Sequence, residues 1–444
     1  MQQITEKSKL LELIETAGVV GAGGAGFPTH VKLNAGLEFL IINGAECEPL
    51  LYKDQVLLQQ QTLKLVECLQ LLVSVLKVPK AIIGIKKKHE TLINRLKQYI
   101  KPPIELCLLE DFYPAGDEQV LVFEATGRII PEGGIPIQVG VAVINIETLY
   151  NVSRALEEQP VITKWVTIGG AVSKPCSLQV PLGISVGELL VDFLAVELKG
   201  MQVIDGGPMM GKLVTDFNTP VTKTTSALLV LPREHPAAVR KQEDFVKTAR
   251  RAKAACIQCS YCSDSCPRQL IGHHFRPHLI MRAFGFPLTQ GAYFKDAYYC
   301  SDCGLCEIVC PNGLSPRAIN SFLKTELAKA KIAREQKDNG NLMANPQRNY
   351  RRMPSQKVKK WLGLKVYDVP APFRSLKMVP DRVNLPLRQH IGAAAVPVVK
   401  EGDAITTGDL IAGIPKGKLG ANLYSSIDGV VSKVDSERIV IERR

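Results

Sequence analysis

Eight of the twelve cysteines fall into two runs of one pattern, and these runs are the part of the chain best suited to chemistry. Each run has the spacing C-x2-C-x2-C-x3-C and is followed directly by proline. The cysteines of the two runs are Cys256, Cys259, Cys262 and Cys266, then Cys300, Cys303, Cys306 and Cys310. Thiolates at this spacing are typical ligands of 4Fe-4S clusters, and the fourth cysteine of each run binds the cluster of the other run.

The spacing therefore predicts two 4Fe-4S clusters with crossed ligands. The expected ligand sets are Cys256, Cys259, Cys262 and Cys310 for one cluster, and Cys300, Cys303, Cys306 and Cys266 for the other. Crossed ligation holds the clusters close together, so we expect this region to pass single electrons. Structural zinc is the alternative, although zinc sites usually bring in their second pair of ligands after a longer insert.

The cysteines outside the runs are expected as free thiols in a reducing compartment. They are Cys47, Cys68, Cys107 and Cys176. The chain starts without a basic and then apolar leader, and no stretch reaches the roughly 18 apolar residues of a membrane helix. We therefore expect a cytoplasmic protein without a membrane span.

The length of 444 residues corresponds to several domains of roughly 100 to 200 residues each. The formal charge of +12 is concentrated between Lys324 and Lys365, a segment with twelve basic and three acidic residues. This segment is interpreted first as a solvated helix end and linker, and second as a docking site for an acidic partner. Binding to nucleic acid is not expected.

A glycine-rich segment, Gly21–Pro28, follows a short amphipathic helix whose apolar face includes Leu10, Leu13 and Ile14. It satisfies G-x-G-x-x-G, but a Rossmann loop follows a strand, and no Gly-Lys-Ser/Thr follows as in a P-loop. The segment is interpreted as a turn whose bare backbone lets a flat or phosphorylated ligand approach closely.

Polar residues follow three strand-like segments at the point where each segment ends. The segments and their polar sequels are Phe39–Ile42 with Asn43–Pro49, Ile104–Leu109 with Tyr113–Glu118, and Val139–Ile144 with Asn145–Thr148. Ligands of α/β proteins bind at the carboxyl ends of strands, so one site for a heterocycle and a ribityl or ribose chain is expected. The alternative is that these residues only form turns and helix caps.

Four motifs in this order resemble a known flavin site. Gly21–Thr29 with Lys32, then NGAECEP, YPAGDE and INIETL, are similar to the NADH-oxidising flavoprotein subunit of respiratory complex I. The similarity to the RnfC proteins of the Rnf electron-transport complex is greater, and that to the cobalamin reductases of propanediol-utilisation microcompartments is greater still. The resemblance covers nearly the whole chain. The domain at the end of this chain is also the last domain of the cobalamin reductases. In the RnfC proteins the related domain precedes the flavin domain.

The resemblance implies the cofactors FMN and two 4Fe-4S clusters, with NADH as electron donor. The residues implied to contact FMN are Gly21, Gly23, Gly24, Lys32, Asn43, Glu46, Gly116, Asn145 and Thr148, with Phe27 as a stacking candidate. Glu48 and Glu118 are implied to act on the nicotinamide nucleotide as catalytic residues. Ala22, Ala45 and Ile144 replace an arginine, an aspartate and an asparagine of the complex I flavoprotein, and the aromatic residue expected near Ile130 is missing.

The resemblance also implies an α/β multidomain fold. The expected regions are an α/β flavin domain of complex I flavoprotein type at 1–160, a β-grasp domain at 161–235, a ferredoxin-like helical domain with two clusters at 236–330, a basic linker at 331–372 and a barrel-sandwich β domain at 373–444. Short strands are expected in the last region at Val383–Leu387, Ala395–Val399, Asp409–Ile414 and Gly429–Val434. The loop Asp205–Gly211 also resembles the RnfC proteins, and no chemistry is assigned to it.

The function implied by the resemblance is the passage of electrons from NADH through FMN and the clusters to cobalamin, in support of a B12-dependent diol dehydratase. The chain lacks the corrinoid motif Asp-x-His-x-x-Gly, so cobalamin is expected to bind transiently or on a partner such as an adenosyltransferase or the diol dehydratase system. Shell proteins of a bacterial microcompartment are further expected partners. The alternatives are an Rnf-like electron-transfer protein and a binding scaffold with structural clusters.

Overall fold

The apolar strand segments near the start of the chain form one parallel sheet of order β3-β2-β1-β5. The computed structural model describes residues 4–285, 291–337, 340 and 342–444. The four strands are β1 (Phe39–Asn43), β2 (Lys80–Lys86), β3 (Ile104–Leu109) and β5 (Val141–Asn145). The three expected strands are present within two residues, and β2 adds a fourth. The carboxyl ends of these strands therefore meet at one edge of the sheet.

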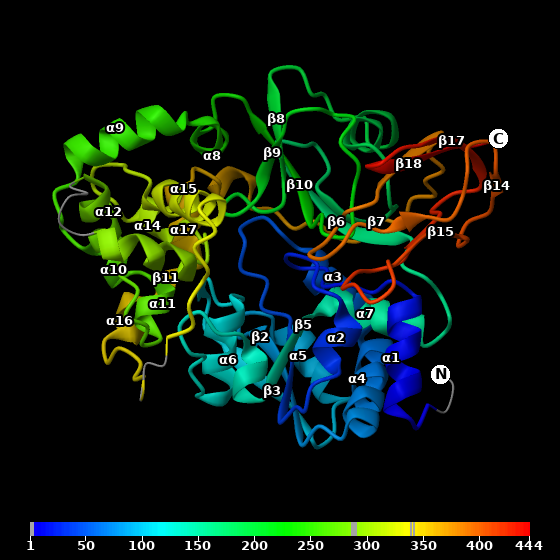
Figure 1. The fold of residues 1–444 in the computed structure, drawn as a ribbon, viewed down its shortest axis with the longest axis horizontal. Coiled ribbons are helices and arrows are strands. Elements are labelled where there is room, and N and C mark those ends of the chain that lie inside the picture. Colours follow the sequence, from blue (N-terminus) through cyan, green and yellow to red (C-terminus); the bar gives the residue numbers. More distant parts are fainter. Residues whose placement is uncertain (1–3, 286–290, 338–339, 341) are drawn as a thin grey trace.

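Helices cover both faces of this sheet, which makes it a three-layer α/β unit (Figure 1). One face packs on α1 (Lys7–Thr16), α4 (Thr62–Leu76) and α7 (Ile146–Ala155), and the other on α6 (Glu118–Thr126). Alternate side chains of β1 enter different cores, since Leu40 faces the first layer and Ile41 the second. The short helices of this unit are α2 (Thr29–Leu33), α3 (Lys53–Gln60) and α5 (Glu90–Lys97).

A second, mixed sheet of order β7-β6-β10-β8-β9 lies above the first unit in Figure 1. Its strands are β6 (Thr163–Gly170), β7 (Cys176–Pro181), β8 (Met201–Asp205), β9 (Lys212–Val214) and β10 (Ala227–Pro232). β6 and β10 are parallel, and the other neighbours are antiparallel. This mixed sheet agrees with the expected β-grasp fold.

The cysteine runs lie among short helices at one end of the molecule (Figure 1). These helices are α9 (Phe245–Ala255), α10 (Tyr261–Asp264), α11 (Pro267–Leu270), α12 (Pro277–Gly285), α14 (Leu305–Ile308) and α15 (Pro316–Lys329). The proline that closes the first run, Pro267, begins α11, a position that suits its missing amide hydrogen. Within the described residues, no helix is both long and apolar enough to cross a membrane.

The segment 331–372, predicted as a basic linker, is folded against the flavin domain where the structure describes it. It contains α16 (Arg348–Arg351), β11 (Met353–Pro354) and α17 (Ser355–Trp361). β11 pairs with β4 (Phe112–Tyr113), and Arg352 lies 3.4 Å from Glu124. Carboxylates of the same chain therefore neutralise part of its charge, so much of this segment is packed instead of extended.

The last region forms two small antiparallel sheets, of orders β12-β18-β17-β14 and β13-β15-β16. Their strands are β12 (Arg382–Pro386), β13 (Val396–Pro397), β14 (Ala404–Ile405), β15 (Leu410–Gly413), β16 (Leu423–Tyr424), β17 (Gly429–Val434) and β18 (Arg438–Glu442). All four expected strands are present, and two facing sheets agree with a barrel-sandwich domain.

Four buried charged side chains join the first unit to the second sheet. Lys53 Nζ lies 2.7 Å from Asp54 Oδ1 and 2.9 Å from Glu147 Oε2. Lys164 Nζ, on β6, lies 2.6 Å from the same Glu147 oxygen. The four side chains are at most 3% exposed, so each charge is stabilised by its ion-pair partners and not by water. Burial opposes the charge of Lys53, but Asp54 and Glu147 raise its pKa.

We predict that Glu147→Gln destabilises the protein by about 3–5 kcal/mol, because two buried ammonium groups lose their shared counter-charge. The free energy of unfolding in urea measures this loss. The control Glu12→Gln breaks an exposed pair of 3.1 Å with Lys9, and such a pair is worth less than about 1 kcal/mol. Equal losses in the two variants would contradict the importance of the buried charges.

Candidate functional site

Three of the predicted site segments meet at the carboxyl edge of the parallel sheet. Asn43 and Asn145 end β1 and β5 and are direct neighbours in the strand register. Asn43 donates from Nδ2 to the carbonyl oxygen of Gly116 at 2.9 Å and accepts from the amide of Ala45 at 3.1 Å. A Cβ on Gly116 would lie 2.7 Å from the carbonyl oxygen of Ala45, so this close approach needs glycine. The amide of Asn43 thus fastens two site loops together.

The glycine-rich segment forms a loop with a fixed base and an exposed tip. The amide of buried Ala22 donates to Thr148 Oγ1 at 2.9 Å, and the amide of Gly21 donates to the carbonyl oxygen of Phe27 at 3.0 Å. Gly23 and Gly24 are exposed, and a Cβ on Gly24 would meet nothing within 4 Å. The tip therefore exposes bare backbone, and its predicted contact with a ligand stays a prediction.

Lys32 and Glu118 form an ion pair at the same edge. Lys32 Nζ lies 3.0 Å from Glu118 Oε1 and donates to the carbonyl oxygen of Val143 at 2.9 Å. Both side chains are partly exposed, at 24% and 43%, so they remain accessible to a ligand. Two of the predicted site residues are thus brought together.

Glu46 carries a carboxyl group whose charge is weakly favoured. Burial and the nearby carboxylate of Asp54 raise the pKa of Glu46 to about 7. Its Oε1 accepts a hydrogen bond from the amide of Glu48 at 3.0 Å. A carboxyl group with this pKa can both take up and release a proton near neutral pH.

Glu48 is held by the loop Asp205–Gly211, for which the sequence predicts no chemical role. Its carboxylate accepts hydrogen bonds from the amides of Met209 and Met210, both at 3.0 Å. A Cβ on Gly207 would overlap Glu48 Oε2, so the loop closes on this carboxylate only with glycine there. The predicted role of Glu48 toward a nicotinamide stays a prediction.

One cysteine set, which we call the inner set, lies deep in the helical region. Its members are Cys266, Cys300, Cys303 and Cys306, of which Cys300 alone is half-buried and the rest are buried. Burial raises the pKa of Cys306, and the charges of Cys300 and Cys303 raise it further. Burial likewise raises the pKa of Cys266 to about 12, with a contribution from Cys300. These thiols are therefore neighbours, and their binding of one cluster stays a prediction.

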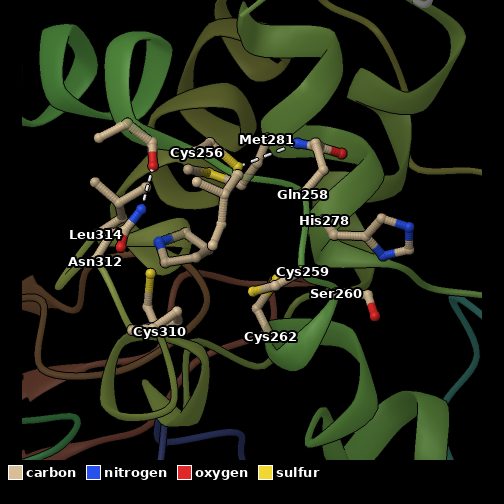
Figure 2. Close-up of a pocket in the computed structure, with 14 residues that line it drawn as sticks. Cys256, Gln258, Cys259, Ser260, Cys262, His278, Met281, Cys310, Asn312 and Leu314 are labelled. Carbon is tan, nitrogen blue, oxygen red and sulfur yellow. Dashed lines mark hydrogen bonds between the residues drawn. The ribbon is translucent and has the colours of Figure 1, made fainter.

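The other set, which we call the outer set, lines one pocket that is partly open to solvent. Its members are Cys256, Cys259, Cys262 and Cys310, all half-buried, and Figure 2 shows their side chains around one space. Gln258 Nε2 donates to Cys256 Sγ at 3.1 Å. Among the described residues, no three His, Cys, Asp or Glu side chains converge as ligands of one metal ion do. The thiolates of a 4Fe-4S cluster bind different irons, so cysteines spaced around one pocket fit a cluster.

The flavin-type domain contacts the inner set at two points. Tyr113, which is 1% exposed, donates from Oη to the carbonyl oxygen of Cys303 at 2.7 Å. Asp117 forms a two-pronged ion pair, at 2.8 and 3.0 Å, with Arg268, which is two residues after Cys266. Cys262 of the outer set also raises the pKa of Cys306, after the effect of burial, so the two sets adjoin. The order in space is the sheet edge, the inner set and the outer set.

Sequence reasoning missed two residues that support the site. Asp54 accepts from Asn145 Nδ2 at 2.7 Å, and Lys164 donates to the carbonyl oxygen of Ala22 at 3.0 Å. Lys164 and Asp54 carry no local signal, because charged residues usually face solvent. The exposed glycine tip, the Asn43 amide and the Lys32 ammonium together fit a flavin with a phosphorylated side chain.

Comparisons with known families agree with this geometry. Residues 14–154 match the family described as Nuo51 FMN-binding domain, residues 255–315 the 4Fe-4S dicluster domain, and residues 371–443 the RnfC barrel sandwich hybrid domain. The fold and the two sites thus define a flavin and iron-sulfur oxidoreductase.

Two curated relatives share nearly the full length of the chain. Cobalamin reductase PduS of Salmonella typhimurium is 41% identical over 439 residues, which cover 98% of this chain and 96% of the relative. Cobalamin reductase PduS of Citrobacter freundii is 41% identical over 438 residues, with 97% and 96% covered. The chain belongs to the PduS family of cobalamin reductases.

Two other likenesses are more limited. The RnfC-type component of the ion-translocating oxidoreductase complex of Vibrio cholerae is 35% identical over 284 residues, which cover 62% of this chain and 35% of that protein. The solved structure of NAD+-reducing [NiFe]-hydrogenase in the H2-reduced state aligns with a TM-score of 0.48 at 19% identity, covering 75% of this chain and 64% of that chain.

We predict that Gly24→Ala leaves the unfolding of the FMN-free protein unchanged, because the added Cβ meets no protein atom. If the loop tip contacts FMN, the same methyl group weakens FMN binding about tenfold. A fluorescence titration of the FMN-free protein measures the dissociation constant.

Gly36→Ala is the matched control, because a Cβ there also meets nothing within 4 Å and lies outside the predicted site. Unchanged FMN affinity in Gly24→Ala would remove the loop tip from the binding site.

Proposed function

We propose that this protein is an NADH-dependent cobalamin reductase, which passes electrons from NADH through FMN and two 4Fe-4S clusters to cobalamin. Bound FMN takes two electrons from a nicotinamide and releases them singly, as 4Fe-4S clusters require. The observation that carries the proposal is the contact of Tyr113 and Asp117 with the inner set, because it joins a flavin-type site directly to cluster ligands.

The residues proposed to hold FMN lie around the carboxyl edge of the parallel sheet. Gly21, Gly23 and Gly24 would approach the flavin and its phosphate, with Lys32 beside the ring and Phe27 stacked on it. The remaining proposed contacts are Asn43, Glu46, Gly116, Asn145 and Thr148. Asn43, Asn145 and Thr148 each form a hydrogen bond with a backbone group of the site, so these side chains are held in place before a ligand binds.

Two carboxylates are proposed to act on the nicotinamide side. Glu118 is partly exposed beside Lys32, and its charge can orient a bound nucleotide. Glu48 is engaged by two loop amides, so any action on the nucleotide would be from a fixed position. Glu46, with its pKa of about 7, is proposed to exchange the proton that accompanies reduction of a flavin ring.

The two cysteine sets are proposed to act in sequence. The eight cysteines would bind two 4Fe-4S clusters with crossed ligands, the inner set nearer to FMN and the outer set nearer to solvent. Burial of three inner cysteines and the open pocket at the outer set support this order. Tyr113, which is buried and donates to the carbonyl oxygen of Cys303, is proposed to shield this path from water.

Cobalamin as acceptor is supported by the name of the two full-length relatives. The chain lacks the Asp-x-His-x-x-Gly corrinoid motif, so we propose that cobalamin binds transiently or arrives on a partner such as an adenosyltransferase or the diol dehydratase system. A place in the cytoplasm inside a bacterial microcompartment, in contact with its shell proteins, belongs to the same proposal.

A second candidate function is electron transfer within an Rnf-like complex, to another redox partner. The match of residues 371–443 to the RnfC barrel sandwich hybrid domain and the 35% identity to the Vibrio cholerae protein favour it. The two candidates share the donor and the clusters and differ in the acceptor.

We predict that NADH, mixed anaerobically with the holoprotein and aquacobalamin, bleaches the flavin absorbance and then lowers the cob(III)alamin band. Stopped-flow spectra follow both bands, and NADH with aquacobalamin alone is the control. Reduced flavin and clusters with no corrin reduction above this control, with free cobalamin and with cobalamin carried on an adenosyltransferase alike, would reject cobalamin and favour the Rnf-like candidate. A flavin that NADH does not bleach would reject the donor.

A further inference from the structure

The outer set forms the end of the electron path that faces solvent. Its four cysteines are half-buried around an open pocket, whereas Cys266, Cys303 and Cys306 of the inner set are buried. If the order of the proposed function holds, an electron that leaves the protein leaves from the outer set. The surface around this pocket therefore decides which acceptor can approach.

Ile257 lines this pocket and exposes an apolar side chain, and two more exposed apolar side chains lie near the outer cysteines in the sequence. Ile257 follows Cys256 and is 65% exposed, and Tyr261 precedes Cys262 and is 55% exposed. Val246 on α9 is also 55% exposed. An apolar and aromatic centre next to a redox group is typical of the core of a protein interface.

A basic helix borders the same pocket. α9 runs directly into Cys256 and contains Lys247, Arg250, Arg251 and Lys253 but no acidic residue. All four basic side chains are exposed, while Thr248 and Ala252 form the buried face. Arg251 Nη2 donates to the carbonyl oxygen of Gly313 at 3.3 Å, which ties the helix to the loop after Cys310.

The acidic groups near this helix are few and are engaged with the chain itself. Glu243 lies 3.7 Å from Arg251, and Asp264 lies 3.3 Å from Arg351. Asp244 accepts from the amide of Lys247 as the N-cap of α9. The helix that leads to the outer pocket thus carries a net positive charge beside the exposed apolar Ile257.

We propose that this face, formed by α9, Ile257 and Tyr261, docks a separate protein that has an acidic surface and carries a one-electron acceptor. The proposal rests on the proposed function for the position of the outer cluster, and it specifies the acceptor side. In each encounter one electron leaves the outer cluster, which is oxidised, and enters the partner's acceptor, which is reduced. No bond or proton changes place.

The positive charge of this face favours an acidic protein partner over free cobalamin. Aquacobalamin is a cation, so the positive rim repels it, whereas an acidic protein surface is steered toward it. Salt weakens such steering because it screens exposed charges beyond about 10 Å at 0.1 M. The docking should therefore be strong at low ionic strength and weak at high ionic strength.

The test uses the full-length holoprotein, with an acidic 2Fe-2S ferredoxin as the probe and calorimetry as the measure of binding. Lys247→Glu/Arg250→Glu should weaken the complex at low salt about tenfold or more. The control Lys416→Glu/Lys418→Glu makes the same change of charge on exposed residues of the last domain, at the far end of the molecule from α9 (Figure 1). This control should bind as the wild type does.

Cross-linking with a carbodiimide gives a second measurement that needs no electron transfer. Lysines of α9, above all Lys247 and Lys253, should form amides with ferredoxin carboxylates in the wild type, and mass spectrometry identifies them. Absence of saturable binding to the wild type, or equal losses in the two charge variants, would overturn the docking face. Cobalamin reduction by NADH is measured separately, so its failure alone would reject the proposed function and leave the docking result standing.

Discussion

The contact between the segment Tyr113–Asp117 and the inner set is the interaction on which the rest of the structure depends. Tyr113 reaches the backbone of Cys303 through its hydroxyl group, and Asp117 holds Arg268 beside Cys266 with both carboxylate oxygens. The same segment touches Asn43 through Gly116. One short stretch of chain therefore sets the separation between a flavin-type site and a cluster site, and electron transfer is sensitive above all to that separation.

Buried polar groups keep this stretch and its neighbours in place. Glu147 on α7 accepts hydrogen bonds from Lys53 and Lys164. Lys164 belongs to the second sheet and also donates to the carbonyl oxygen of Ala22, so both the sheet and the glycine loop are fixed to α7. Glu48 does the same for the loop Asp205–Gly211, whose amides enclose its carboxylate. Buried charges are costly to desolvate, and removal of one partner strongly destabilises the protein. Each of these contacts therefore fixes the relative position of two parts of the fold. The exposed glycine tip is free to approach a ligand because its base is held in this way.

The fold and the site differ in how far the sequence could predict them. Cysteine spacing predicts both ligand sets, because the spacing within each run is a local signal for a 4Fe-4S cluster with crossed ligands. The polar ends of β1 and β5 meet because parallel strands end at one edge of the sheet. β2 escapes prediction, since its apolar core is short and bounded by lysines. The contacts of Glu48 with Met209 and of Glu147 with Lys164 could not be predicted, because Met209 is 161 residues from Glu48 and Lys164 belongs to a different unit of the fold. The packing of the basic segment against Glu124 could not be predicted for the same reason, because a sequence does not show which opposite charges pair.

The order of the two clusters is tested most directly by removing one ligand from each set. Cys256→Ser disables the outer cluster and Cys303→Ser the inner one, and the backbone oxygen that Tyr113 contacts remains in both. After NADH is added anaerobically, rapid-freeze EPR follows the remaining cluster in each variant. If electrons pass from FMN to the inner and then to the outer cluster, the inner cluster of Cys256→Ser is reduced at the wild-type rate, whereas the outer cluster of Cys303→Ser is reduced far more slowly. Fast reduction of the outer cluster without its inner neighbour would contradict this order.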